Sequence, residues 1–261
     1  MKRRLLIFSL IAITLGWSGR VIFAADQKDT FAKANQDYAA EHFQDAIIGY
    51  ETVVRSGPWS ANLFYDLGNA WFRAGNFGQA ILNYERARAL EPHHPETEAN
   101  LRLVRDEARA LELKKTAIDR YLEIGTARQY SVVGSIAFWL ACFCGARLFF
   151  SGRRSAVAMV VILFCLIVFF AAAFAVYTLE TGNRGTGVAI VTGNNIEARL
   201  ATADNANTVL ALPPGSEITL LSQRGDWIYA ALPNDLRGRI PANGAERVRL
   251  DSPLSSRARQ E

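Results

Sequence analysis

The sequence predicts a multidomain membrane protein that combines an all-α repeat solenoid, two transmembrane helices and a small all-β barrel. Three observations support this prediction: a set of residues recurs with a period of 34, two long stretches lack charged residues, and short alternating runs follow the second stretch. A repeat period of about 20 to 50 residues is typical of solenoids, and about 20 apolar residues suffice to cross a bilayer. Short alternating runs between turn residues indicate β-strands.

The N-terminus, residues 1–24, has the pattern of a secretory signal peptide. Basic residues precede an apolar run over residues 5–15, and the small residues Ala24 and Ala25 follow it. Cleavage after Ala24 and cleavage after Ala25 fit equally well, and an uncleaved anchor of the same orientation is the alternative. In each case we expect the chain that follows to be exported.

The formal net charge of +4 does not indicate an anionic partner. Residues 1–24 hold four basic residues and no acidic residue, so the chain without them is formally neutral. Phosphate binding requires a lasting excess of Lys and Arg, which excludes nucleic acid as a predicted partner.

The repeat lies in residues 26–117, where a set of residues of the first copy recurs 34 residues later. Phe43, Ala46, Ile47, Tyr50, Glu51 and Pro58 recur as Phe77, Ala80, Ile81, Tyr84, Glu85 and Pro92, and Asn35 recurs as Asn69. This pattern resembles the tetratricopeptide repeat, a pair of antiparallel helices in which small residues allow close approach and aromatic residues fill the remaining space. We predict copies at residues 27–60 and 61–94, and a capping helix at 95–116.

The first helix of each pair lines the inner face of such a stack, where we predict a groove for a peptide of a protein partner. Amide side chains both donate to and accept from a peptide backbone, and aromatic rings hold apolar side chains. Packing between the helices is the alternative role for Tyr38 and Phe72. The predicted partner-binding residues are Asn35, Tyr38, Asn62, Tyr65, Asn69, Phe72 and Arg73.

Two transmembrane helices are predicted at residues 129–150 and 155–178. Between Arg154 and Glu180 lie 25 consecutive uncharged residues. The export signal places the repeats outside, so the loop with Arg147, Arg153 and Arg154 is cytoplasmic, in agreement with the positive-inside rule. All three cysteines lie within these helices, so we expect no disulfide and interpret them as small packing residues.

Residues 185–250 show five alternating runs that predict an all-β meander, and residues 251–261 are predicted to be a flexible tail. The runs are 188–191, 196–200, 208–212, 217–221 and 227–231. A Leu-Pro-Pro-Gly turn at 212–215, Gly-Asp-Trp-Ile-Tyr at 225–229 and Gly-Arg-Ile-Pro at 238–241 resemble the bacterial SH3-like domain. That family usually has a Trp where Arg239 stands, and we interpret Trp227 as a core residue.

No pattern of catalytic residues is found in the sequence. His42 lies in a turn between helices, and His93 and His94 lie between two prolines, where we expect them to be solvated. Metal-protease, nucleotide-binding and nucleophile-elbow motifs are missing from the sequence. We therefore predict no enzyme activity, no cofactor and no metal.

Taken in order, the signal peptide, repeat pair, two spans and barrel resemble the BatE-type proteins of the Bacteroides aerotolerance operon. This resemblance implies a membrane complex with von Willebrand factor A-domain proteins, a MoxR-type ATPase system and oxidative or envelope stress. The resulting hypothesis is a scaffold in the bacterial inner membrane, with both folded domains periplasmic. In the alternative, the barrel binds peptidoglycan and the repeats recruit an envelope enzyme; Arg239 in place of Trp counts against it.

Overall fold

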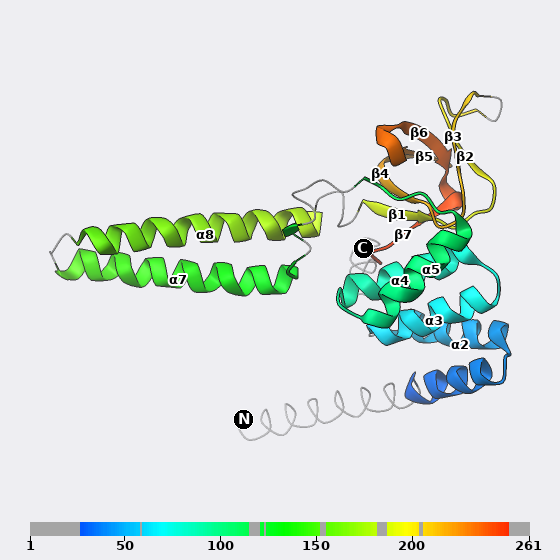
Figure 1. Cartoon of the computed structure of the whole chain (residues 1–261), viewed down its shortest axis with the longest axis horizontal. Coiled ribbons are helices and arrows are strands. Elements are labelled where there is room, and N and C mark those ends of the chain that lie inside the picture. Colours follow the sequence, from blue (N-terminus) through cyan, green and yellow to red (C-terminus); the bar gives the residue numbers. More distant parts are fainter. Residues whose placement is uncertain are drawn as a thin grey trace, which may run out of the picture. The chain divides into compact units, whose positions relative to one another are not determined.

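The computed structural model describes residues 27–57, 59–114, 121–122, 124–151, 155–181, 187–203 and 206–250. The chain folds into two compact units, and the boundary between them lies between Ala108 and Arg109 (Figure 1). The predicted signal peptide, the tail, and Arg153 and Arg154 lie outside the described residues.

The first unit is an array of helix pairs, which confirms the all-α repeat class. Residues 27–39 are helical. The helices that follow are α2 (Phe43–Ser56), α3 (Ala61–Arg73), α4 (Phe77–Leu90) and α5 (Pro95–Ala108). Polar side chains begin two of them: Ser60 accepts a hydrogen bond from the Leu63 N–H, and Asn76 accepts one from the Gln79 N–H. Such caps satisfy backbone donors that the first helical turn leaves unpaired.

Small residues allow the helices to approach as the repeat pattern predicts. A Cβ on Gly68 would stand 2.8 Å from the ring of Tyr84, so the tyrosine packs directly on the backbone of α3. In the first copy Ala34 holds the position of Gly68, and the space is made by Gly49, whose added Cβ would stand 2.8 Å from the Ala34 Cβ. Ala46 and Ala80 are fully buried. Each copy thus has a close contact between its two helices at a glycine, but the glycine lies in the first helix of one copy and in the second helix of the other.

The capping helix α5 ends at Ala108, so the predicted continuation of the helix is wrong for residues 109–114, and residues 115–116 lie outside the described residues. Arg109 has a φ of 51°, in the left-handed region, which stops the helix. The chain beyond it belongs to the second unit: the Leu111 N–H donates to Ser216 Oγ at 3.1 Å, and the Glu217 N–H donates to the Leu111 carbonyl at 2.8 Å. Leu111 also packs against the core of the sheet domain. Tertiary contacts with strands far along the chain therefore override the local helical pattern.

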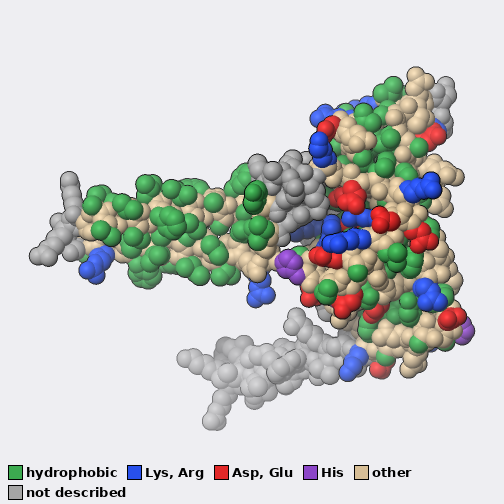
Figure 2. All heavy atoms as spheres, in the orientation of Figure 1, with side chains coloured by type: hydrophobic (Ala, Val, Ile, Leu, Met, Phe, Trp, Pro, Cys, Tyr) green, Lys and Arg blue, Asp and Glu red, His purple; other side chains and the backbone are tan. Residues whose placement is uncertain are grey.

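Two long helices, α7 (Ala127–Ser151) and α8 (Ala156–Thr181), form an antiparallel hairpin. Gly134 lies against Ala172, and the ring centroids of Phe138 and Phe169 are 5.6 Å apart. A later residue of α7 thus contacts an earlier residue of α8, as expected for antiparallel helices. Both helices are long and apolar enough to cross a membrane. Hydrophobic side chains cover the visible surface of the pair (Figure 2), and this surface indicates membrane association.

The cysteines of the hairpin have different environments. Cys165 is buried between the helices and packs with Ala137 and Ala141, as the sequence predicted. Cys142, in contrast, is exposed on the outer surface of α7. All three cysteines are free.

The C-terminal domain is an antiparallel sheet in the order β3-β2-β6-β5-β4-β1-β7. Its strands are β1 (Val188–Val191), β2 (Ile196–Arg199), β3 (Thr208–Leu212), β4 (Glu217–Arg224), β5 (Trp227–Ala231), β6 (Arg237–Pro241) and β7 (Ala245–Arg247). The five predicted runs are strands. The prediction of a simple meander is wrong, because β1 pairs with β4 and β7, and β2 pairs with β6.

One face of every strand contributes to a single buried cluster, so the sheet curls around its own core. Along β5, Ile228 and Ala230 are buried, whereas Trp227 and Tyr229 lie half-buried on the opposite face. Successive side chains of a strand point to opposite faces. The interpretation of Trp227 as a core residue is therefore wrong.

Contacts of the sheet domain also relate the two ends of the helical hairpin. Leu111 precedes α7 and Ser216 follows α8, yet the two residues are hydrogen bonded. At the other end of the domain, Arg249 Nη1 donates to the carbonyl of Glu180, in the last turn of α8, at 3.3 Å. An antiparallel pair whose flanking segments meet in this way has its two outer ends on the same side of any membrane that it crosses.

Candidate functional site

We call the seven residues predicted to bind partners the repeat face; two of them lie in the helix of residues 27–39 and five lie in α3. In α3, Asn62, Tyr65, Asn69, Phe72 and Arg73 follow helical spacing, which places them on one side of the helix. The other side of α3 is buried against the neighbouring helices. Asn35, Asn62 and Arg73 are exposed, whereas the other four are half-buried.

An asparagine of the repeat face accepts a hydrogen bond from a buried tyrosine in each copy. Tyr50 Oη donates to Asn35 Oδ1 at 2.7 Å, and Tyr84 Oη donates to Asn69 Oδ1 at the same distance. Burial raises the pKa of both tyrosine hydroxyls above the ordinary value, so both remain protonated donors. The bond fixes the amide plane of each asparagine relative to the helix.

These bonds determine what the asparagines offer to a partner. Because the tyrosines occupy the Oδ1 atoms, the Nδ2 groups of Asn35 and Asn69 are left as donors, with no acceptor among the residues that the structure describes. An amide NH₂ group can donate to a peptide carbonyl. The repeat period thus presents two oriented donors on the repeat face.

In the second copy the network extends to the capping helix. Asn100 Nδ2, on α5, donates to Asn69 Oδ1 at 2.9 Å and to Tyr65 Oη at 3.3 Å. The Tyr65 ring also lies 5.2 Å from the ring of His94. These contacts join α3 to α5 and stiffen the middle of the repeat face.

Aromatic packing holds other residues of the repeat face. The ring centroids of Tyr38 and Phe43 are 5.5 Å apart, and Tyr38 packs at the edge of the core of the first copy. These contacts favour a packing role for Tyr38. The ring centroids of Phe72 and Phe77 are 6.1 Å apart. The guanidinium of Arg73 stands 4.6 Å from the Phe43 ring centroid and 3.7 Å from Glu41. Arg73 is therefore a positioned but accessible cation.

Sequence reasoning missed Asn100 and misjudged His94. The 34-residue shift could not have marked Asn100, because its counterparts in the earlier copies are Asp66 and Ala32. His94 is not solvated as expected: its Nδ1 accepts from the Thr97 N–H at 3.2 Å and begins α5. Its side chain is only 16% exposed. Histidine is not among the residues that usually cap helices, so the sequence does not indicate that His94 caps α5.

Asp66 is the ionisable group of the site with the largest consequence for pH dependence. Burial raises its pKa to about 6, and the charge of His94 opposes this shift. An unfolded aspartate titrates near 3.9. The folded state therefore binds the Asp66 proton more tightly, and its stabilising effect is complete below about pH 4 and lost as pH rises through about 6.

We expect Asp66→Asn to stabilise the repeat unit at pH 7.5 but not at pH 4, because the amide mimics the protonated acid. The gain at the higher pH is on the order of 1 kcal/mol for a partly solvated group. Hydrogen exchange of α3 peptides in the detergent-solubilised chain measures it at both pH values. An equal effect at the two pH values would show that charge burial is not the cause.

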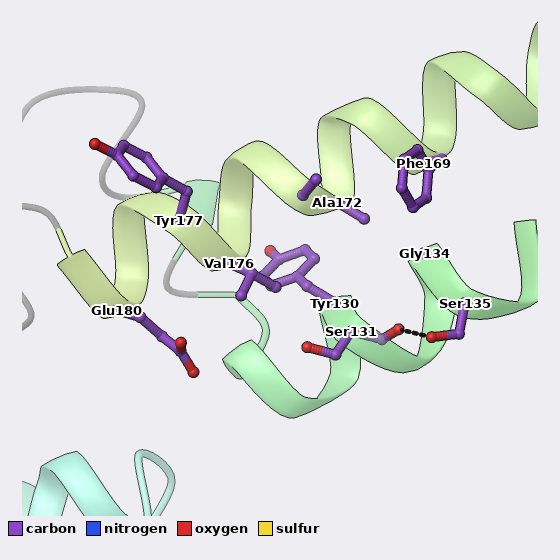
Figure 3. A pocket seen from close by; sticks show the side chains of 10 residues that line it. Tyr130, Ser131, Gly134, Ser135, Phe169, Ala172, Val176, Tyr177 and Glu180 are labelled. Carbon is purple, nitrogen blue, oxygen red and sulfur yellow. Dashed lines mark hydrogen bonds between the residues drawn. The ribbon is translucent and has the colours of Figure 1, made fainter. Parts of the chain in front are cut away.

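A cavity of about 460 Å³ lies between α7 and α8 near Tyr130 and Glu180 (Figure 3). Its hydroxyl groups serve the helix backbone: Ser131 Oγ donates to the Ala127 carbonyl and Ser135 Oγ to the Ser131 carbonyl, both at 2.8 Å. Much of the remaining lining is apolar. Within the described residues, no group of three or more His, Cys, Asp or Glu side chains is placed to hold a metal ion.

Comparison with known proteins identifies the second repeat. Residues 61–94 match the tetratricopeptide repeat family, over the same 34 residues that the period predicted. No curated protein matches the chain. Tetratricopeptide repeats are typically interaction modules without catalytic activity, so the match supports a role in protein–protein interaction.

Proposed function

We propose that this chain is a non-enzymatic scaffold of the bacterial inner membrane that binds an extended segment of a protein partner through the repeat face. The observation that supports it is the pair of asparagines, Asn35 and Asn69, whose amide donors are oriented by buried tyrosines on the repeat face. Donors at a regular spacing suit the carbonyl groups of an extended peptide. The half-buried rings between them suit its apolar side chains.

The proposed compartment is the periplasm for both the repeat domain and the sheet domain. It is supported by the export pattern of residues 1–24, and by the contact of Leu111 with Ser216, which brings the two outer ends of the hairpin to one side. A single anchor that holds two domains raises the concentration of one bound partner around the other.

The proposed partners follow from the resemblance to BatE-type proteins. The order of parts and the SH3-like motif at 225–229 support membership of an aerotolerance-type complex, with von Willebrand factor A-domain proteins as partners in envelope or oxidative stress. In such a complex the repeat face would hold a partner segment at the membrane surface.

The test compares two double variants of the tagged full chain by crosslinking in intact membranes and mass spectrometry. Asn62→Ala with Arg73→Ala removes two exposed groups of the repeat face without touching the Asn–Tyr bonds. We expect crosslinked partner to fall at least about tenfold, as for loss of interface anchor residues. Asn35 and Asn69 are less suitable targets, because their loss would remove the acceptors of two buried hydroxyls.

The matched control is Gln44→Ala with Arg55→Ala on α2. These residues have the same spacing in the chain, are also exposed, and lie outside the repeat face. Partner recovery from this variant should equal that of the parent chain. Equal recovery from both double variants would rule out the repeat face as the binding surface.

A further inference from the structure

The outer face of the sheet domain gathers four arginines around two aromatic rings. Strand register places Arg224 beside Trp227, and Tyr229 beside Arg239, on neighbouring strands. Arg239 in turn pairs with Arg199 of β2. Paired residues of adjacent strands project from the same face of a sheet. Together with Arg237, which shares its face with Arg239, these residues form what we call the arginine face.

Hydrogen bonds fix part of this face and leave the rest accessible. Arg239 Nη1 donates to the Leu200 carbonyl at 2.6 Å, and its guanidinium lies 5.4 Å from the Tyr229 ring centroid. Arg199 pairs with Glu197, the acidic residue on the same side of β2, at 3.7 Å. Arg224 and Arg237 are exposed. The face therefore keeps an excess of positive charge beside two half-buried amphipathic rings.

The domain is also held close to the end of a membrane-spanning helix. Six residues separate Thr181, the end of α8, from Val188, the start of β1. Such a connection reaches at most about 25 Å when fully extended. The hydrogen bond from Arg249 to the Glu180 carbonyl ties the last residues of the domain to the same helix end. Lipid headgroups are therefore a surface that the arginine face can reach without any soluble partner.

We propose that the arginine face binds the anionic phospholipid headgroups of the membrane that holds α7 and α8. Guanidinium groups form paired hydrogen bonds with phosphate, and Trp and Tyr favour the boundary between headgroups and hydrocarbon. Each arginine near an anionic surface strengthens binding about fivefold, so the two exposed ones provide most of the accessible charge. This binding restrains the domain against the bilayer and depends on membrane anchoring but not on the repeat face.

Hydroxyl-radical footprinting of the full chain in nanodiscs tests this proposal, because it measures solvent access of Trp227 and Tyr229 directly. One set of discs holds phosphatidylcholine alone, and the other holds about one third phosphatidylglycerol. We expect oxidation of both rings to fall at least about threefold in the anionic discs, and to recover in about 1 M salt, where charges are screened within a few ångströms. Trp59, in the repeat unit, provides the internal reference.

Two double variants with the same loss of charge complete the experiment. Arg224→Gln with Arg237→Gln should abolish the protection of Trp227. Arg55→Gln with Arg102→Gln, at exposed positions of α2 and α5, should retain it. Equal oxidation in both kinds of disc would overturn the proposal, as would protection that survives in the first variant. Protection that appears in neutral discs only when peptidoglycan fragments are added would overturn it in favour of a wall ligand.

Discussion

Replacement of Glu85 by alanine is expected to destabilise the repeat unit by about 3–5 kcal/mol, the usual cost of breaking a buried ion pair by removing one member. The Glu85 side chain is 5% exposed and contacts two arginines, Arg105 at 2.5 Å and Arg88 at 2.7 Å. Arg105 is itself 9% exposed and comes from α5, so the pair joins the capping helix to α4. Loss of the carboxylate would remove the ion pair that joins α5 to α4 and loosen α5.

The matched control is Glu51→Ala, at the same position of the first copy. Glu51 is 39% exposed and pairs with Arg55 within one helix at 3.4 Å. An exposed pair of this kind contributes less than about 1 kcal/mol. Hydrogen exchange of α4 and α5 amides should accelerate at least about a hundredfold in the Glu85 variant. Similar acceleration in the two variants would mean that the ion pair does not hold the cap.

The repeat shows what spacing can predict and what it cannot. The period identified Ala46 and Ala80 because close helix approach imposes residue size at fixed positions. The same period marked Glu51 and Glu85 as equivalent, although the Glu51 side chain is 39% exposed and the Glu85 side chain is 5% exposed. The two glutamates also differ in their partners. Glu85 pairs with Arg105, 20 positions further on, whereas the residue 20 positions after Glu51 is Trp71, which cannot form an ion pair. A partner outside the repeated positions cannot be read from the period.

The sheet domain illustrates a second limit. The pattern of short runs between turn residues located β1 to β5, although burial alternates residue by residue along β5 and not along β1, whose four residues are all buried. It could not reveal that β1 lies between β4 and β7, since alternation is the same for every partner strand. For Trp227, size and apolarity suggested the core, but its position relative to Ile228 placed it on the outer face. The local pattern predicts helix at Leu111, because the residues that hold it in the sheet domain, Ser216 and Glu217, lie about a hundred positions away and leave no local signal.

Of the candidate site, the α3 part of the repeat face was predictable and its internal bonds were not. Helical spacing alone puts Asn62, Tyr65 and Asn69 on one face. That Asn69 accepts from Tyr84, 15 residues later, depends on how α4 packs against α3. His94 was expected to be solvated because the flanking prolines suggested an exposed loop, and only the fold shows it as a cap.

Truncation of Tyr84 to alanine is the second change with a large expected effect, again about 3–5 kcal/mol for an aromatic residue removed from a core. Its ring is fully buried against Gly68, which has no side chain with which to fill the cavity. Tyr84→Phe keeps the ring and removes only the hydroxyl, so it should cost about 1 kcal/mol. The difference between the two variants isolates the packing contribution.

The first copy provides the comparison that separates the hydroxyl from its surroundings. Tyr50→Phe removes the same bond, but Asn35 is exposed, so water can replace the lost donor, and the cost should be smaller than for Tyr84→Phe. At Tyr84 the acceptor is half-buried and shared with Asn100, so loss of the hydroxyl also weakens the link from α3 to α5. Hydrogen exchange of α5 amides should therefore accelerate in Tyr84→Phe and not in Tyr50→Phe. If α5 responds equally to both, the asparagine network does not connect the second copy to its cap, and the orientation of the Asn69 donor has another cause.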